Sequence, residues 1–279
     1  MLAVALALGA ALSYGVGDFL GGLKSRSLHV LTVLALSQLA GLAGITLWLL
    51  LSRGDLPDAG NAAQAAGAGL AGAIGLGAMY RGMAIGAMGV VAPISAGAAA
   101  VPFVVGLVQG ERPTLLQIGG ALLALLGVVL ISREPAPVGA RVASGVGLAF
   151  VAAVGFGLFF VLLDAASSEG TSTAGTVFVA RATATAFALA VALAAGVELR
   201  PARQHIPAVL AVGLFDVAAN ILFALATTRG LLSVVSVLAS LYPVTTVALA
   251  AVLLRERLAG VQRVGAGTAL AGAALLSSG

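Results

Sequence analysis

Four ionisable side chains lie inside long apolar stretches of this 279-residue sequence, namely Asp18, Arg81, Arg181 and Asp216. A charge within hydrocarbon is costly, so such residues usually face a cavity or pair with one another. Arg181 and Asp216 are each expected near mid-depth in consecutive membrane helices, where an ion pair between them is plausible. That pair either neutralises itself and holds the helices together, or Arg181 orients an anionic ligand group while Asp216 supplies a counter-charge or proton site. Asn220 follows Asp216 by four residues and would extend the same polar face.

Asp18 is expected within two turns of the end of the first apolar stretch, close to Lys24 and Arg26. Two interpretations stay open for it. The carboxylate forms a salt bridge at the membrane surface with one of these cations, or it takes up and releases a proton. Tyr14 lies one helical turn earlier on the same face and would share that second site.

Arg81 is expected near the end of the third apolar stretch. Its long side chain either reaches out to the lipid headgroups or lines a polar path through the protein. Tyr80 is adjacent to it in the sequence and points to another part of the helix surface, so the two are not expected to act as one unit.

Serines recur on roughly one face of the ninth apolar stretch, at Ser233, Ser236 and Ser240, and Ser240 corresponds to Ser95 in the fourth stretch. Hydroxyl groups in membrane helices commonly form hydrogen bonds between helices, and the alternative is that these serines form a cavity wall. The same two stretches carry the prolines, which remove backbone hydrogen bonds and kink helices, at Pro93, Pro102 and Pro243.

Metal and cofactor chemistry is not expected from this sequence. It has no cysteine, and His29 and His205 stand in separate loops without a second histidine nearby. The many glycines are not in the strand–loop–helix setting of a phosphate-binding loop. They are expected to let helices approach closely. Because the acidic residues are isolated from one another, an enzyme is not expected either.

The composition is that of a membrane protein. Hydrophobic residues make up 61% of the chain and charged residues 9%, whereas soluble domains average about 25% charged residues. Since lipid offers no partner to unpaired backbone groups, the spans are predicted as helices, which gives an all-α polytopic membrane protein. The arginines at span ends are interpreted as headgroup and topology signals, so nucleic acid is not an expected partner. Ten spans are predicted, at 2–21, 30–51, 66–85, 88–108, 114–132, 145–164, 174–195, 207–226, 231–252 and 260–277.

The second half of the chain repeats the first at an offset of 145 residues. Glu111-Arg112 and Glu256-Arg257 stand before corresponding stretches, in which Gln117 matches Gln262 and Gly120 matches Gly265. We interpret the two Glu-Arg junctions mainly as local pairs that define span ends. The division is predicted at 1–134 and 145–279, with a linker at 135–144. Because each half has five spans, an odd number, the second half must enter the membrane from the opposite side, as an inverted 5+5 repeat.

Basic residues are unevenly divided between the two sides of the predicted topology. The positive-inside rule places the richer side in the cytoplasm and both termini outside. Abundant alanine and glycine, with arginine in place of lysine, suggest a bacterium, so the expected location is the bacterial cytoplasmic membrane. The richer side holds Lys24, Arg26, Arg133, Arg141, Arg200, Arg203, Arg255, Arg257 and Arg263, and the other side holds Arg53, Arg112 and Arg229.

The whole chain resembles the EamA-type ten-helix members of the drug/metabolite transporter superfamily. The resemblance is carried by the junctions at 110–113 and 255–258, by Tyr242-Pro243-Val244, and by Ser13-Tyr14-Gly15 with the glycine-rich segment at 17–22. One departure is Ala98, which stands where the repeat offset would place the counterpart of Pro243.

The resemblance implies a secondary transporter with alternating access, whose substrate cavity lies between the repeats near mid-membrane, with spans four and nine at its wall. The expected partners are the lipid bilayer and a small organic metabolite, amino acid-like or drug-like, moved with proton or exchange coupling. Arg181 favours a cargo that bears a carboxylate. A channel or scramblase and a non-transporting sensor or structural protein remain alternatives, and monomer and homodimer stay open.

Overall fold

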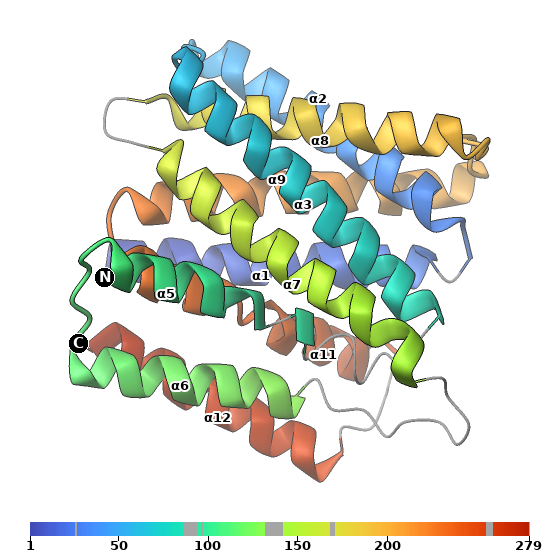
Figure 1. The fold of residues 1–279 in the computed structure, drawn as a ribbon. Coiled ribbons are helices and arrows are strands. Elements are labelled where there is room, and N and C mark those ends of the chain that lie inside the picture. Colours follow the sequence, from blue (N-terminus) through green and yellow to red (C-terminus); the bar gives the residue numbers. More distant parts are fainter. Residues whose placement is uncertain are drawn as a thin grey trace.

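The chain folds into a bundle of helices, as seen in a computed structural model that describes residues 1–25, 27–85, 94–95, 97–131, 142–167, 171–254 and 259–278 (Figure 1). The described residues contain no β-strand. The helices, in chain order, are α1 Leu2–Ser25, α2 Val30–Ser52, α3 Ala59–Ile85, the 3-10 turn η1 Gly97–Ala99, α5 Ala100–Val108, α6 Leu115–Ile131, α7 Val142–Ala165, α8 Thr173–Ala194, the 3-10 turn η2 Arg203–His205, α9 Ile206–Thr227, α10 Leu232–Ala239, α11 Tyr242–Leu253 and α12 Gly260–Ser278.

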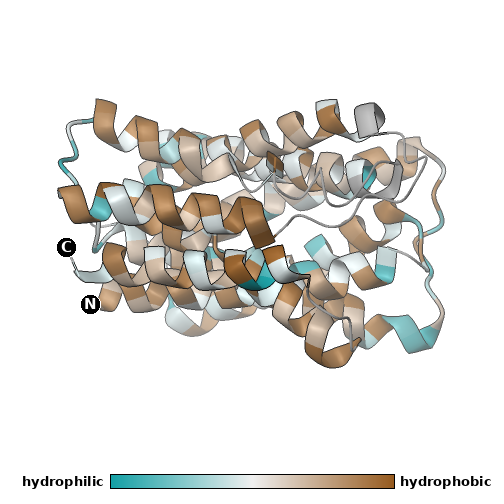
Figure 2. Cartoon of the chain, turned by 90° about the horizontal axis from the view of Figure 1, so that it is seen from below, coloured by the Kyte–Doolittle hydropathy of each residue, from teal (hydrophilic) through white to brown (hydrophobic). Residues whose placement is uncertain are grey.

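Many of these helices have the length and apolarity of membrane spans. Polar residues lie mostly toward the ends of the helices, and apolar residues follow their lengths (Figure 2). The prediction of a multi-span all-helical fold is therefore confirmed, while the count of ten spans stays a prediction. Seven stretches of the described chain are long and apolar enough to cross a membrane, Leu2–Ser25, Val30–Ser52, Ala59–Gly82, Gly145–Ala165, Thr173–Ala194, Arg203–Thr227 and Leu232–Leu253, and two shorter apolar helices are Gly97–Val108 and Leu115–Ile131.

The third helix begins earlier than its apolar stretch predicted, at Ala59. The reason is a side-chain cap: the carboxylate of Asp58 accepts hydrogen bonds from the backbone N–H of Gly60 (2.9 Å) and of Asn61 (3.2 Å). Such caps satisfy backbone donors at the first turn of a helix. The hydrogen bond from the backbone of Asn61, together with that from Gly60, lowers the pKa of Asp58 from its ordinary value.

The ninth predicted span is not one continuous helix. It is interrupted at Ser240 and Leu241, between α10 and α11, and Pro243 stands in the first turn of α11. Proline is tolerated there because its missing N–H would have no partner within the helix. In the fourth span the structure describes a 3-10 turn, Gly97–Ala99, directly before α5. Pro93, Glu256 and Arg257 lie outside the described residues.

The helix contacts come in matched pairs. α1 packs on α9 while α7 packs on α3, and α2 packs on α9 while α8 packs on α3. α2 packs on its counterpart α8, and α6 on its counterpart α12, which lie side by side in Figure 1. This is the pattern expected when two similar halves are related by a two-fold axis, since exchanging the halves leaves the set of contacts unchanged.

Glycines let α6 and α12 approach closely, as small residues do in membrane helix pairs. A Cβ added to Gly120 would stand 2.9 Å from the carbonyl oxygen of Gly272, and one added to Gly265 would stand 2.9 Å from that of Gly127. The repeat offset relates Gly120 to Gly265 and Gly127 to Gly272, so the two contacts are copies of one another. The recurring glycines are thus explained by backbone contact between the helices.

Candidate functional site

A cavity lies near the middle of the helix lengths and encloses about 720 Å³ of empty space, its mouth included. Helices from both halves of the chain contribute to its wall. The lining residues are Tyr14, Asp18, Gln38, Gly69, Gly72, Ala73, Leu76, Ala98, Phe156, Phe159, Phe160, Ala180, Arg181, Ala184, Asp216, Asn220, Ser240 and Tyr242.

An ion pair joins two helices at this cavity. A terminal guanidinium nitrogen of Arg181 in α8 lies 2.5 Å from a carboxylate oxygen of Asp216 in α9. The side chain of Arg181 is 3% exposed and that of Asp216 is 26% exposed. The ion pair predicted from the sequence is therefore present, and the carboxylate is its more accessible member.

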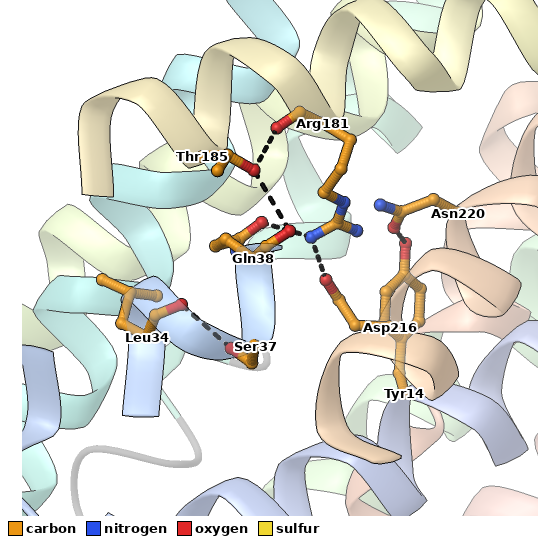
Figure 3. Close-up of polar contacts among 8 residues, drawn as sticks. All are labelled: Tyr14, Leu34, Ser37, Gln38, Arg181, Thr185, Asp216 and Asn220. Carbon is orange, nitrogen blue, oxygen red and sulfur yellow. Dashed lines mark hydrogen bonds and ion pairs between the residues drawn. The ribbon is translucent and has the colours of Figure 1, made fainter. Parts of the chain in front are cut away.

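Gln38 of α2 is the second partner of Arg181. The same guanidinium nitrogen donates a hydrogen bond to the side-chain oxygen of Gln38 (Figure 3). The hydroxyl of Thr185 is the donor to two backbone carbonyl oxygens, that of Gln38 at 3.1 Å and that of Arg181 at 2.7 Å. Three helices are thus tied together around one buried cation, and this arrangement fixes the direction in which the guanidinium points.

Tyr14 and Asn220 form a second polar link between the halves. The phenol oxygen of Tyr14 in α1 donates to the amide oxygen of Asn220 in α9 over 2.6 Å (Figure 3). The Tyr14 ring also stands edge-on to Phe160 and Tyr242, with ring centroids 6.3 and 6.4 Å away. Asn220 lines the cavity together with Asp216, as their four-residue spacing on α9 predicted.

Asp18 lines the cavity without a bound partner. Among the described residues its carboxylate has neither an ion pair nor a hydrogen bond, and the predicted salt bridge with Lys24 is not formed. Arg26, the other cation considered for it, lies outside the described residues. Asp18 therefore presents a partly exposed carboxylate to the cavity.

The structure divides the sequence-predicted site residues into two groups. Six of the ten transport candidates line the cavity: Tyr14, Asp18, Arg181, Asp216, Asn220 and Ser240. The other four do not. Tyr80 is buried with its hydroxyl against Gly21, Arg81 is exposed, Ser95 is buried, and Pro243 is buried at the start of α11. The roles of all ten residues in transport remain predictions.

The serine side chains of the ninth span are buried, but among the described residues their hydroxyl groups form no hydrogen bonds to other helices. The Ser236 hydroxyl donates to the carbonyl oxygen of Ser233 (3.2 Å) within α10, and the hydroxyl of Ser240, directly after α10, donates to the carbonyl oxygen of Val237 (2.8 Å). The Ser233 hydroxyl has no partner among the described residues. Among the described residues, the serine hydroxyls therefore form no hydrogen bonds between helices, which was one of the two interpretations, and Ser240 alone of the three lines the cavity.

Most of the residues that line the cavity were not predicted from the sequence. Gln38 precedes Arg181 by 143 residues, close to the repeat offset of 145, and this spacing is the signal in the sequence that could have identified the two residues as neighbours. The aromatic residues Phe156, Phe159 and Phe160 were not singled out. Hydropathy alone does not separate a buried phenylalanine such as Phe160 (5% exposed) from an outward one such as Phe150 (59% exposed) on the same helix.

Glu111 forms a link between the halves in place of the local pair predicted with Arg112. Its two carboxylate oxygens accept hydrogen bonds from the backbone N–H groups of Leu232 (2.6 Å) and Ser233 (3.0 Å), at the start of α10. Arg112 is exposed and forms no ion pair with Glu111. Gly110 has φ +94°, a left-handed conformation that glycine adopts without strain, and it turns the chain so that Glu111 reaches α10.

Comparisons with known proteins agree with this architecture. A solved structure described only as "Crystal structure of protein" superposes with a TM-score of 0.78 over 98% of this chain and 95% of its own, at 19% identity. That likeness is one of fold. Among curated protein sequences, none matches significantly. A family model described as "EamA-like transporter family" matches residues 1–133 and again residues 143–278, nearly the whole sequence. The chain belongs to the EamA-like transporter family.

Proposed function

We propose that this chain is a secondary carrier that moves a small organic molecule across a cell membrane by alternating access. Membership of the EamA-like transporter family supports transport of small molecules across a membrane. The observation that carries the finer proposal is the mid-depth cavity, where an ion pair and a second polar link join α8, α2, α9 and α1. In carriers, substrate sites lie near the bilayer midplane between repeats.

Interrupted helices at the cavity support the same proposal. Ala98 lies in the 3-10 turn before α5, Ser240 lies at the break between α10 and α11, and Tyr242 begins α11. All three line the cavity. Broken helices expose backbone groups that regular helices keep bonded, and in transporters such breaks commonly border the binding site.

The packing on either side of the cavity is unequal. The largest buried cluster includes Ala7, Leu163, Phe223 and Leu232, near the starts of α1 and α10 and the ends of α7 and α9, the helix ends on the side of the two termini in Figure 1. The same cluster also reaches Phe159 and Phe160 at the cavity wall. Two smaller clusters, around Tyr80 and around Ala188, lie toward the other end. In our proposal the large cluster is the closed gate of this conformation, and transport requires it to open while the other end closes.

The proposed architecture is an inverted repeat of five helices at 1–134 and five at 145–279, joined by a linker at 135–144. The two matches to the family model and the matched helix contacts support this division. In the proposed orientation, the arginine-rich ends face the cytoplasm of a bacterial cell, following the positive-inside rule. Lys24, Arg200 and Arg203 lie at that end of the bundle.

Counterflow in proteoliposomes tests the carrier function. A panel of amines, amino acids, carboxylates and nucleotide sugars is first screened for thermal stabilisation of the purified protein. Vesicles loaded with an unlabelled stabilising compound are then diluted into a trace of its labelled form. A carrier gives a transient accumulation of label inside, because each labelled molecule enters in exchange for an unlabelled one.

Other outcomes identify the alternative functions. A channel or scramblase lets label equilibrate without the transient accumulation, and a sensor or structural protein moves no label although it binds the compound. Protein-free liposomes and vesicles without the internal compound are the controls. Either alternative outcome would contradict the proposal of a carrier.

A further inference from the structure

The charges that line the cavity do not balance. Among its described lining residues, the charged side chains are Asp18, Arg181 and Asp216. The guanidinium of Arg181 is neutralised by Asp216 at 2.5 Å and also donates to Gln38. One acidic side chain, that of Asp18, is left without an opposite charge among the described residues, and a bound cation would favour its ionised form.

Arg181 is also out of reach of a ligand in this conformation. Two of its nitrogens, Nε and one Nη, have no hydrogen-bond partner among the described residues, but they are buried with almost no exposed surface. A Cβ added to Gly41 would stand 3.3 Å from the Nε atom, so that side of the guanidinium faces the backbone of α2. The carboxylate-bearing cargo favoured from the sequence would need this cation to be accessible. Asp18 and Asp216 are the partly exposed acidic groups at the cavity, and of these two only Asp18 has no cationic partner among the described residues.

Aromatic rings share the wall of the cavity with Asp18. Tyr14, Phe156, Phe159, Phe160 and Tyr242 line the cavity with Asp18. The faces of aromatic rings attract cations through their negative quadrupole, more strongly where water is excluded. The same rings repel anions and offer an apolar surface to the body of a ligand. Negative charge and aromatic faces thus favour the same class of ligand.

We propose that the cavity binds a monovalent organic cation, an ammonium group on an aromatic or apolar body, with Asp18 as the counter-charge. This inference rests on the proposed function, because it takes the mid-depth cavity as the transport site. An unpaired carboxylate in an apolar surrounding is costly, and a bound ammonium removes that cost. The rings hold the rest of the molecule.

Three small aromatic probes that differ in charge test the proposal. Phenethylammonium is a cation, phenylacetate an anion and phenylalanine a zwitterion. Binding of each labelled probe to the purified full chain in detergent is measured by equilibrium dialysis near neutral pH. The expected result is that phenethylammonium binds at least about tenfold more tightly than either other probe, as loss of a charge-assisted contact would give.

Variants locate the binding to Asp18. Asp18→Asn is expected to weaken phenethylammonium binding by about tenfold or more, while Asp18→Glu keeps the charge and retains most of the affinity. Asp55→Asn removes an equal charge from an exposed loop position and should leave the affinity unchanged. Retained binding by Asp18→Glu shows that a carboxylate at this position is sufficient, and an unchanged melting temperature of Asp18→Asn shows that its loss of binding is not a failure to fold.

Three results would overturn the proposal: tighter or equal binding of phenylacetate or phenylalanine, phenethylammonium binding that is unaffected in Asp18→Asn, or no phenethylammonium binding at all. Counterflow separates this failure from that of the carrier function. Binding that needs Asp18 without counterflow would support the cation site and contradict the carrier. Counterflow of phenylacetate would support the carrier and contradict the cation site.

Discussion

Arg181 of α8 donates a hydrogen bond to the side chain of Gln38 in α2, although 143 residues separate them in the sequence. That separation is close to the repeat offset, and α2 and α8 are the second helices of the two proposed halves. The contact therefore lies near the proposed two-fold axis and joins two positions that differ from exact correspondence by two residues, since the offset of 145 relates Gln38 to Thr183. A polar cluster near such an axis contacts both halves, so its hydrogen bonds are expected to change when the halves move relative to one another.

Breaking the Arg181–Asp216 ion pair on one side should destabilise the protein strongly. Arg181→Met leaves the carboxylate of Asp216 unpaired, and Asp216→Asn leaves a guanidinium that is 3% exposed without its counter-charge. Loss of one partner of a buried pair costs roughly 3–5 kcal/mol. The melting temperature should fall by several degrees in both variants. It is measured in detergent as the temperature at which the monodisperse peak in size-exclusion chromatography is lost.

The double variant Arg181→Met with Asp216→Leu separates packing from transport. Replacing both charges with apolar groups is commonly close to neutral for stability, so its melting temperature should return toward that of the parent. We expect its transport to stay lost, because Asp216 lines the cavity. Full transport by a stable double variant, or by the charge-swapped Arg181→Asp with Asp216→Arg, would show that the pair only holds the helices together.

Tyr14→Phe removes the 2.6 Å hydrogen bond to Asn220 but keeps the ring. Hydrogen bonds between membrane helices are worth about 0.6 kcal/mol on average, so the melting temperature should change little. Transport should fall more than stability, because the bond links α1 to α9 at the cavity. Tyr80→Phe removes a buried hydroxyl that lies against Gly21 outside the cavity, and its transport should match the parent. Equal losses in both variants would contradict a specific role for Tyr14.

Glu111→Ala should lower stability by about 1–2 kcal/mol, the usual cost of losing a helix cap. The variant leaves the N–H groups of Leu232 and Ser233 at the start of α10 without the acceptor that they have in the parent. Thermal unfolding in detergent measures the effect, with the exposed neighbour changed in Arg112→Ala as the control, for which a change within about 0.5 kcal/mol is expected. Equal effects of the two variants would mean that the cap does not stabilise α10.

Much of the fold could be predicted because apolar length is itself the physical requirement for crossing a membrane. The bounds of α2 and α9 lie within a residue or two of their apolar stretches. α3 was mispredicted because its first turn depends on a hydrogen-bonding cap at Asp58, which hydropathy does not detect. The break before Pro243 could be anticipated from the chemistry of proline, while its position at Ser240 and Leu241 is seen only in the structure.

The candidate site was only partly predictable, for a different reason. Charged residues in apolar helices are conspicuous, so Asp18, Arg181 and Asp216 were found from the sequence, and all three line the cavity. The direction in which a helix faces depends on its neighbours, so the sequence did not show that Arg81 points outward. The cross-repeat role of Glu111 was missed because its partners lie 121 and 122 residues away along the chain.

Gly127→Ala should push α6 and α12 apart. A Cβ at Gly127 would collide with the backbone of Ala269, whereas one at Gly119, on the same helix, would meet no atom within 4 Å. Overpacking of this kind typically costs about 1–3 kcal/mol. Gly119→Ala should be neutral or slightly stabilising, since alanine favours helix more than glycine does. Unfolding measurements that gave the two variants the same stability would contradict close packing of these helices.

Alternating access is tested most directly by cysteine labelling, for which the parent chain has no cysteine of its own. Leu76→Cys places a thiol on the cavity wall, and Leu163→Cys places one in the large buried cluster, at 0% exposure. Leu56→Cys is the control, at a loop position that is 60% exposed near the terminal end of the bundle. A membrane-impermeant maleimide is applied from each side of oriented vesicles, with and without phenethylammonium or whichever compound gives counterflow.

The proposed mechanism predicts that the compound changes the labelling rates of Leu76→Cys and Leu163→Cys in opposite directions and from opposite sides of the membrane. Leu56→Cys should keep a constant rate. Labelling of Leu76→Cys and Leu163→Cys from one side at once, or rates that rise and fall together, would show a continuous path and contradict alternating access.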